Sequence, residues 1–224
     1  LERTASEDLP VPVRTQLEDA MIAACREVGD LFLQSDQLEN AYQYLQMIGE
    51  LEPIRAALRT RSPGEEGVST FVDLALTRGL APVRGIELVL QHYGLCQAIS
   101  ACEGLFQQSI LPVDREASIR LILRATHEEL VSRLQQELST KGVTSTEGKT
   151  VNELIQGQNW LFENDNYHID TSHLNAVVRL ARTLKPCAEI KLAQELSAYG
   201  AKLSSRYRYA DPPPFEDVYV DSGR

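Results

Sequence analysis

The chain has 224 residues, of which 43% are hydrophobic and 24% are charged, and 22 basic against 32 acidic residues give it a formal net charge of −10. This composition is ordinary for a soluble globular protein and argues against wholesale disorder. The acidic balance argues against nucleic acid or an anionic membrane as the main partner, and the absence of any run of about 18 apolar residues predicts that no transmembrane helix is present.

The two ends of the sequence indicate a piece of a longer protein. It begins at Leu1 rather than Met, and its last segment mixes apolar and acidic residues up to Arg224. We therefore interpret residues 1–11 as an N-terminal extension, 12–210 as the helical domain, and 211–224 as a proline-rich extension toward a missing region.

The spacing and placement of the cysteines indicate a cellular compartment. None of the four forms a C-x-x-C pair with another: Cys25, Cys96, Cys102 and Cys187. Two of them, Cys25 and Cys102, fall on apolar helical faces, which suits reduced and buried thiols. Reduced thiols are typical of the cytoplasm, and this is the location that we predict.

Helical periodicity dominates the first half of the chain. From Pro12 to Ser35 apolar residues recur at three- and four-residue steps, and Thr15 with Glu18 three residues later forms a capping box at the start of this helix. A tight turn over 35–37 follows. Further helices are predicted over 38–48, in a short segment opened by Pro53, from an N-cap at Ser62 to about Arg78, and from Pro82 to Gly94.

The second half continues in the same pattern. A stripe from Leu95 is closed by Pro112, and Asp114 is predicted to cap a long helix that reaches about Thr140. The polar stretch 140–149 is the best internal boundary of the helical domain. Three more helices are predicted after it: from a capping box of Thr150 and Glu153 through Phe162, from Asp170 or Thr171 through Leu184, and from Cys187 to Arg206.

No segment of useful length alternates with a period of two, so the sequence offers no strands for a sheet. The ten prolines all fall at the ends of the proposed helices or between them. We predict an all-α fold in which roughly ten helices form antiparallel hairpins that stack on one another.

One of these hairpins resembles a known repeat. Residues 22–55 are similar to a tetratricopeptide repeat, a helix–turn–helix unit of about 34 residues. The packing positions of that family fall on Gly29, Phe32, Ala41, Leu45 and Pro53, while Cys25 and Ile48 depart from its pattern. Segments 68–93 and 160–186 look like degenerate hairpins. The resemblance implies a stacked α-helical repeat array, and the alternative is a non-repetitive bundle with one coincidental match.

The resemblance also implies a binding role, because arrays of this kind hold peptides on the face of their first helices. In the matched hairpin this face falls on Arg26, Asp30, Leu33 and Gln34. The competing interpretation is a solvated face on which Arg26 and Asp30 form an i,i+4 ion pair.

Two patterns that suggest enzyme chemistry are better explained without it. The stretch Gly142–Thr150 has five residues between its glycines where a phosphate-binding loop needs four, and it follows a helix instead of a strand. His92 and Cys96 are separated by Gly94, which we expect to break the helix between them. The basic-aromatic segment 206–209 suits a helix C-terminus as well as it suits nucleic acid.

The densest group of potential metal ligands is His168, Asp170 and His173. Asp170 has a simpler role as an N-cap that accepts a hydrogen bond from the backbone N–H near His173. Metal ligation needs side chains that converge on one point, and the spacing alone does not bring these together.

The sequence therefore predicts a non-enzymatic helical-repeat module that binds a protein or peptide within a larger polypeptide, with no cofactor. An acidic surface is compatible with a basic peptide partner. Two alternatives remain open at this point: an all-α metal-dependent hydrolase that uses His168, Asp170 and His173, and a purely structural domain that packs against the rest of its own chain. The oligomeric state is not predicted.

Overall fold

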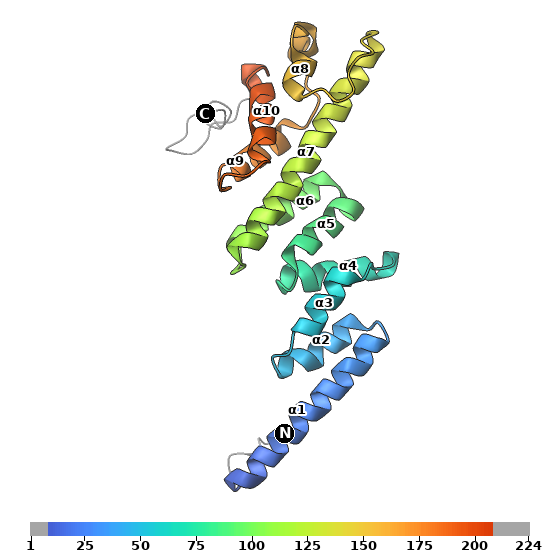
Figure 1. Cartoon of the computed structure of the whole chain (residues 1–224), viewed down its shortest axis with the longest axis vertical. Helices are drawn as coiled ribbons and strands as arrows, with labels where there is room; N and C mark the ends of the chain where they lie inside the picture. Colours follow the sequence, from blue (N-terminus) through green and yellow to red (C-terminus); the bar gives the residue numbers. More distant parts are fainter. Residues whose placement is uncertain (1–8, 208–224) are drawn as a thin grey trace. The chain divides into compact units, whose positions relative to one another are not determined.

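The computed structural model describes residues 9–207, and within this range every regular element is a helix (Figure 1). The predicted all-α class is confirmed. The α-helices are α1 (Val11–Gln34), α2 (Leu38–Met47), α3 (Glu52–Thr60), α4 (Val68–Val72), α5 (Pro82–Tyr93), α6 (Leu95–Gly104), α7 (Pro112–Thr140), α8 (Val151–Ile155), α9 (Thr171–Ala181) and α10 (Ile190–Gly200). Shorter 3₁₀ or π turns are η2 (Glu65–Gly67), η3 (Asp73–Thr77), η4 (Leu105–Gln107), η5 (Asn159–Asp165) and η6 (Ser205–Tyr207).

The chain divides into two compact units, Leu1–Gly85 and Ile86–Arg224. This division falls inside α5, whereas the loop 140–149, where the sequence suggested a boundary, lies within the second unit. The reason is that α8, which follows the loop, packs against both α7 and α10. The loop therefore joins helices of one and the same unit.

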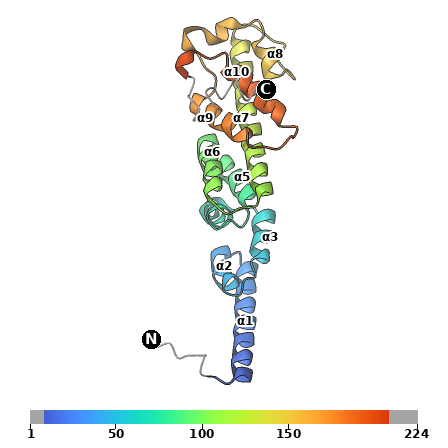
Figure 2. The ribbon, with the colours of Figure 1, turned by 90° about the vertical axis from the view of Figure 1, so that its left-hand side faces the viewer.

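In the first unit, α1 and α2 form an antiparallel hairpin and lie side by side in both views (Figures 1 and 2). The predicted turn between them is present: the N–H of Gln37 donates to the carbonyl of Phe32 at 2.9 Å, and Asp36 takes a left-handed backbone with φ of 58°. Aspartate adopts this conformation more readily than most residues. The turn places α2 directly against the C-terminal part of α1.

The segment after the hairpin departs from prediction. Pro53 lies in the first turn of α3, as expected, but Ser62 caps no helix, and the continuous helix predicted to about Arg78 is broken into η2, α4 and the π-helical turn η3. Two glycines within four residues, Gly64 and Gly67, lower the helix propensity of the first turns.

The second unit is built on α7, a helix of 29 residues against which α6, α8, α9 and α10 pack. One face of α7 is buried along almost its whole length, and this face includes Ile119, Leu123, Leu130, Leu134 and Leu138. The segments around α7 contribute further buried residues to the core of this unit: Leu105, Val151, Leu174, Val177, Leu196 and Tyr199.

Two of the predicted N-terminal caps are present in the structure, and two others are not. The capping box of Thr150 and Glu153 is present in both directions, and Asp170 caps α9. The predicted caps Thr15 and Asp114 are wrong, because α1 and α7 begin earlier, next to Pro10 and at Pro112. Proline fixes φ near its helical value, so it starts a helix without a side-chain cap.

All three helices after the loop 140–149 are shorter than predicted. Helix α8 ends at Ile155, shortly before Gly157, which has a positive φ of 73°. Helix α9 ends at Ala181 instead of Leu184, and α10 covers Ile190–Gly200 and so is shorter at both ends. Arg206 lies in η6 and pairs with Asp165 (Nη1 to Oδ2, 2.7 Å), so its charge has a protein partner. The rest of the basic-aromatic segment and the proline-rich extension 211–224 lie outside the described residues. Among the described helices, none combines the length and the apolar character needed to cross a membrane.

The close approach of α1 and α2 at Gly29 allows the packing of the hairpin to be tested. A Cβ added at Gly29 would lie 2.7 Å from Cγ and Cδ2 of Leu45, a fully buried residue, so we expect Gly29→Ala to lower the free energy of unfolding by about 1–3 kcal/mol through overpacking. The matched control is Gly104→Ala, since a Cβ there meets nothing within 4 Å. Urea denaturation followed by circular dichroism measures both. Equal stability of the two variants would contradict the close approach.

Candidate functional site

The α1–α2 hairpin carries the residues predicted for peptide binding, and small and apolar residues fill its interior. Ala41 and Leu45 of α2 are fully buried, and Gly29 of α1 is buried beneath Leu45. Phe32 and Tyr44 stack across the hairpin with ring centroids 5.6 Å apart. This packing fixes which side of α1 remains open to solvent.

Arg26 does not form the predicted pair with Asp30. Its guanidinium instead binds Glu50, beyond the end of α2, through Nη2 to Oε1 at 2.5 Å and Nε to Oε2 at 2.8 Å. The hydrogen bond to Glu50 is the largest influence on Arg26 and raises its pKa, and the same bond lowers the pKa of Glu50. Both side chains are partly exposed, so this bidentate pair orients the Arg26 side chain more than it stabilises the fold.

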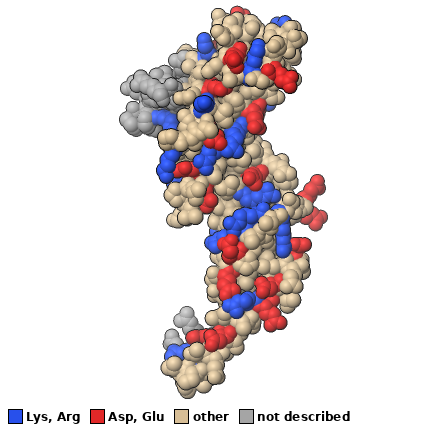
Figure 3. All heavy atoms as spheres, viewed as in Figure 1, with Lys and Arg blue, Asp and Glu red and all other residues tan. Residues whose placement is uncertain are grey.

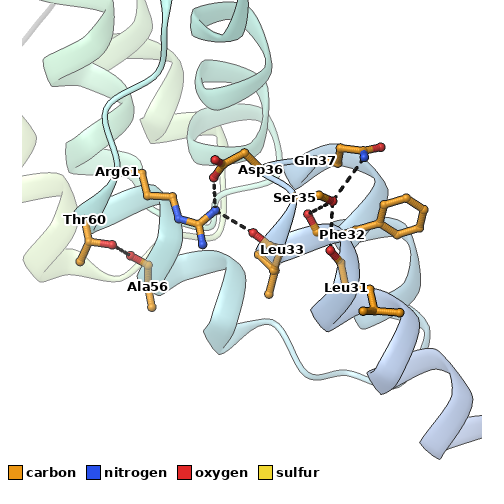
Figure 4. Close-up of polar contacts among 9 residues, drawn as sticks. All are labelled: Leu31, Phe32, Leu33, Ser35, Asp36, Gln37, Ala56, Thr60 and Arg61. Atoms are coloured by element: carbon orange, nitrogen blue, oxygen red, sulfur yellow. Dashed lines mark hydrogen bonds and ion pairs between the residues drawn. The ribbon is translucent and has the colours of Figure 1, made fainter.

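Leu33 is placed differently from the expectation. It is buried, and its carbonyl accepts a hydrogen bond of 2.9 Å from Nη1 of Arg61, which also contacts Oδ1 of Asp36 at 2.6 Å (Figure 4). Leu33 therefore faces the inside of the first unit and is not available to a ligand. Spacing along α1 could not reveal this, because Arg61 comes from the end of α3.

The other three predicted residues lie together around one hollow. Arg26, Asp30 and Gln34 line a shallow cavity of about 380 Å³ on α1, together with Ala23, Glu27 and Leu31. Asp30 and Glu27 bring two carboxylates to this hollow, and Leu31 brings an apolar side chain. The hollow can thus take a chain that presents both a basic and an apolar group.

The second place with predicted site residues is a cavity of about 740 Å³ in the second unit. It is lined by the start of α6, one face of α7 and the segment that leads into α9. Its walls include His168, Asp170 and His173, with Glu137 and Arg133 from α7. The cavity therefore brings the three candidate metal ligands to one region.

The side chains of this cavity are engaged with the protein itself. His168 is buried, its Nδ1 lies 2.9 Å from the hydroxyl of Tyr199, and its Nε2 lies 2.9 Å from Oε2 of Glu137. The backbone N–H of His168 donates to the same hydroxyl at 2.8 Å. Both ring nitrogens thus have a protein neighbour at hydrogen-bonding distance, which favours a positioning role within the core.

Asp170 performs the capping role that the sequence suggested. Its Oδ1 accepts hydrogen bonds from the backbone N–H of Ser172 at 2.8 Å and of His173 at 3.3 Å, and from the Ser172 hydroxyl. The Ser172 hydroxyl bond is the largest influence that lowers the pKa of Asp170. Across residues 9–207, no three or more His, Cys, Asp or Glu side chains are grouped so that they could hold a metal ion.

Sequence reasoning missed a second histidine–carboxylate contact on α7. Nε2 of His127 lies 2.9 Å from Oε2 of Glu195 on α10, and the same oxygen accepts from the backbone N–H of Val151 at 2.9 Å. These partners are 68 and 44 residues apart, so no local spacing could have identified them. The carboxylate of Glu195 joins α7, α8 and α10 at one point.

No family model, no curated protein and no solved structure matches this chain.

The buried histidine predicts a pH dependence of stability. Desolvation by burial is the largest influence on the pKa of His168 and lowers it, although Glu137 opposes this shift. In the unfolded chain the same imidazole has a pKa of about 6.5, so it binds a proton more readily there than in the folded chain. The free energy of unfolding should fall as the pH drops below about 6.5 toward the folded pKa. Denaturation at several pH values between 7.5 and 5 measures this fall.

The variant His168→Gln should show a smaller fall over the same pH range, while the control His92→Gln, which alters an exposed residue of α5, should follow the native chain. Carboxylates such as Asp165 and Asp170, whose pKa is lowered mainly by side-chain hydrogen bonds, titrate below the ordinary range of a carboxyl group and so act outside this window. Parallel curves for native chain and His168→Gln would contradict the assignment.

Proposed function

We propose that the α1–α2 hairpin is a non-enzymatic binding module that takes up a protein segment or peptide along α1, within a larger polypeptide. The observation that carries the proposal is the open hollow formed by Arg26, Asp30 and Gln34. The resemblance of residues 22–55 to a tetratricopeptide repeat supports it, since arrays of that family bind peptides on the equivalent face.

A rigid support behind the hollow adds to this proposal. The contact of Gly29 with Leu45 fixes α2 against α1. Arg61 binds both the Leu33 carbonyl and Asp36, which ties the end of α1 and the following turn to α3. A surface held in place before binding loses little conformational entropy when a ligand binds.

No comparable observation supports the alternative function, a metal-dependent hydrolase. Both ring nitrogens of His168 lie against protein groups, and the carboxylate of Asp170 caps α9. The third possibility, a purely structural domain, differs from a binding module in one measurable respect. It predicts that no free peptide binds to the isolated chain.

Selection from a displayed library of random peptides tests the proposal. We expect selected peptides to bind the purified chain in fluorescence anisotropy, and Asp30→Ala and Gln34→Ala to weaken binding by about 3–10-fold, because each truncation removes a polar contact at the hollow. The matched control Gln43→Ala changes an exposed residue of α2 outside the hollow and should bind like the native chain.

Two results would count against a non-enzymatic binding module. The first is a set of selected peptides whose affinity does not change in either variant. The second is elemental analysis that finds about one tightly held metal ion per purified chain, which would restore the hydrolase.

A further inference from the structure

The loop between α3 and η2 contains a serine whose hydroxyl is not used by the fold. Ser62 is exposed, and residues 61–64 form no regular element. No helix begins at this position, and the hydroxyl makes no hydrogen bond to any described residue. The backbone here is extended, with ψ of 150° at Arg61 and 169° at Gly64, and the residue before a proline favours the same conformation. Ser62 is therefore open to an enzyme that binds an extended segment.

The neighbours of Ser62 in the sequence narrow the kind of enzyme. Ser62 is the one serine or threonine of the chain that precedes a proline, Pro63, and arginines lie one and three residues before it. Proline has no N–H to donate, so the groove of the enzyme cannot depend on a hydrogen bond from this position. Protein kinases discriminate among substrates by patterns of charge around the acceptor hydroxyl. The segment thus matches a kinase that selects proline directly after the serine.

Ser118 shows why the charge pattern alone is insufficient. Arg115 also lies three residues before it. However, Ser118 belongs to α7 and is fully buried, and its hydroxyl donates to the carbonyl of Asp114 at 2.9 Å. A kinase could reach it only if α7 left its neighbours. Ser62 combines the charge pattern with exposure and an extended backbone.

We propose that Ser62 is phosphorylated by a proline-directed protein kinase and that the phosphate releases the turn between α1 and α2 from α3. The donor is ATP. Oγ of Ser62 bonds to the γ-phosphorus, the bond from that phosphorus to the β–γ bridging oxygen breaks, ADP leaves, and the hydroxyl proton passes to a carboxylate of the kinase. This inference does not rest on the proposed function, because it concerns the attachment of the hairpin and not its ligand.

Arg61 provides the attachment on which the phosphate acts. Its Nη1 lies 2.9 Å from the carbonyl of Leu33 and 2.6 Å from Oδ1 of Asp36 (Figure 4). The Cα atoms of Arg61 and Ser62 are about 3.8 Å apart, so the flexible arginine side chain reaches a phosphate on its neighbour. A phosphoserine carries a charge of about −1.5 to −2, and arginine binds phosphate through two parallel hydrogen bonds. The phosphate therefore competes with the single charge of Asp36 for the guanidinium.

The surroundings of Ser62 favour this competition because they are negative. Ser62 lies two residues after Thr60, the end of α3, where the last helix carbonyls carry partial negative charge. The exposed residues Glu65 and Glu66 follow in η2, and Figure 3 shows acidic side chains that protrude from the surface over the start of α4. A phosphate among such charges is destabilising unless a cation neutralises it. Arg61 is the cation next to it in the chain.

Incubation of the full chain with ATP and a purified proline-directed kinase tests the site. We expect mass spectrometry to find about one phosphate per chain, on Ser62, and at least about tenfold slower incorporation in Pro63→Ala. Ser62→Ala should take up none. The matched control is Ser69→Ala, which changes an exposed serine of α4 and should be phosphorylated like the native chain.

Hydrogen exchange tests the release of the turn. In the phosphorylated chain we expect the amides of residues 35–37 to exchange at least about threefold faster, while those of α7 keep their rates. Arg61→Gln should exchange fast in the turn without phosphate, and phosphorylation should add no further change. The matched control Arg59→Gln removes the other nearby arginine, which is paired with Glu52 within α3, and should respond to phosphate like the native chain.

Three results would overturn the inference. The first is a native chain that takes up no phosphate on Ser62, or that takes it up no faster than Pro63→Ala. The second is exchange in the turn that phosphorylation leaves unchanged. The third is a response to phosphate that persists in Arg61→Gln and disappears in Arg59→Gln, because the other arginine would then bind the phosphate.

Discussion

Each helix of this protein has only other helices on which to bury an apolar stripe, since no sheet is found in residues 9–207. In the second unit α7 meets this constraint fully: eight of its 29 residues are buried, and four helices pack around it. In the first unit α1 does not, because two of its 24 residues are buried. The same physical requirement thus explains a core in one unit and an exposed apolar surface in the other.

The sequence predicted the helices well because each is encoded by local signals. The periodicity of α1 and α7, the turn over 35–37 and the caps at Thr150 and Asp170 depend on residues a few positions apart. The errors at Thr15 and Asp114 have one cause: a proline upstream had already started each helix. Two starting signals in one segment compete, and spacing alone does not say which one acts.

The candidate site was less predictable because its contacts join distant segments. Arg26, Asp30 and Gln34 could be placed on one face of α1, yet the burial of Leu33 depends on neighbours outside that helix. Likewise His168 appeared as a metal ligand in the sequence and is a buried residue held between Tyr199 and Glu137. The contact of His127 with Glu195 gave no local signal at all.

Arg61 connects three segments of the first unit, namely the end of α1, the turn that follows it and the end of α3. The last carbonyls of α1 lack partners within the helix, and the guanidinium of Arg61 supplies one to Leu33 while it neutralises Asp36 in the turn. A residue at the end of α3 therefore acts as a remote C-cap for α1. Fraying of α3 would therefore take one hydrogen bond from the end of α1 and one ion pair from the turn before α2, although neither of these segments belongs to α3.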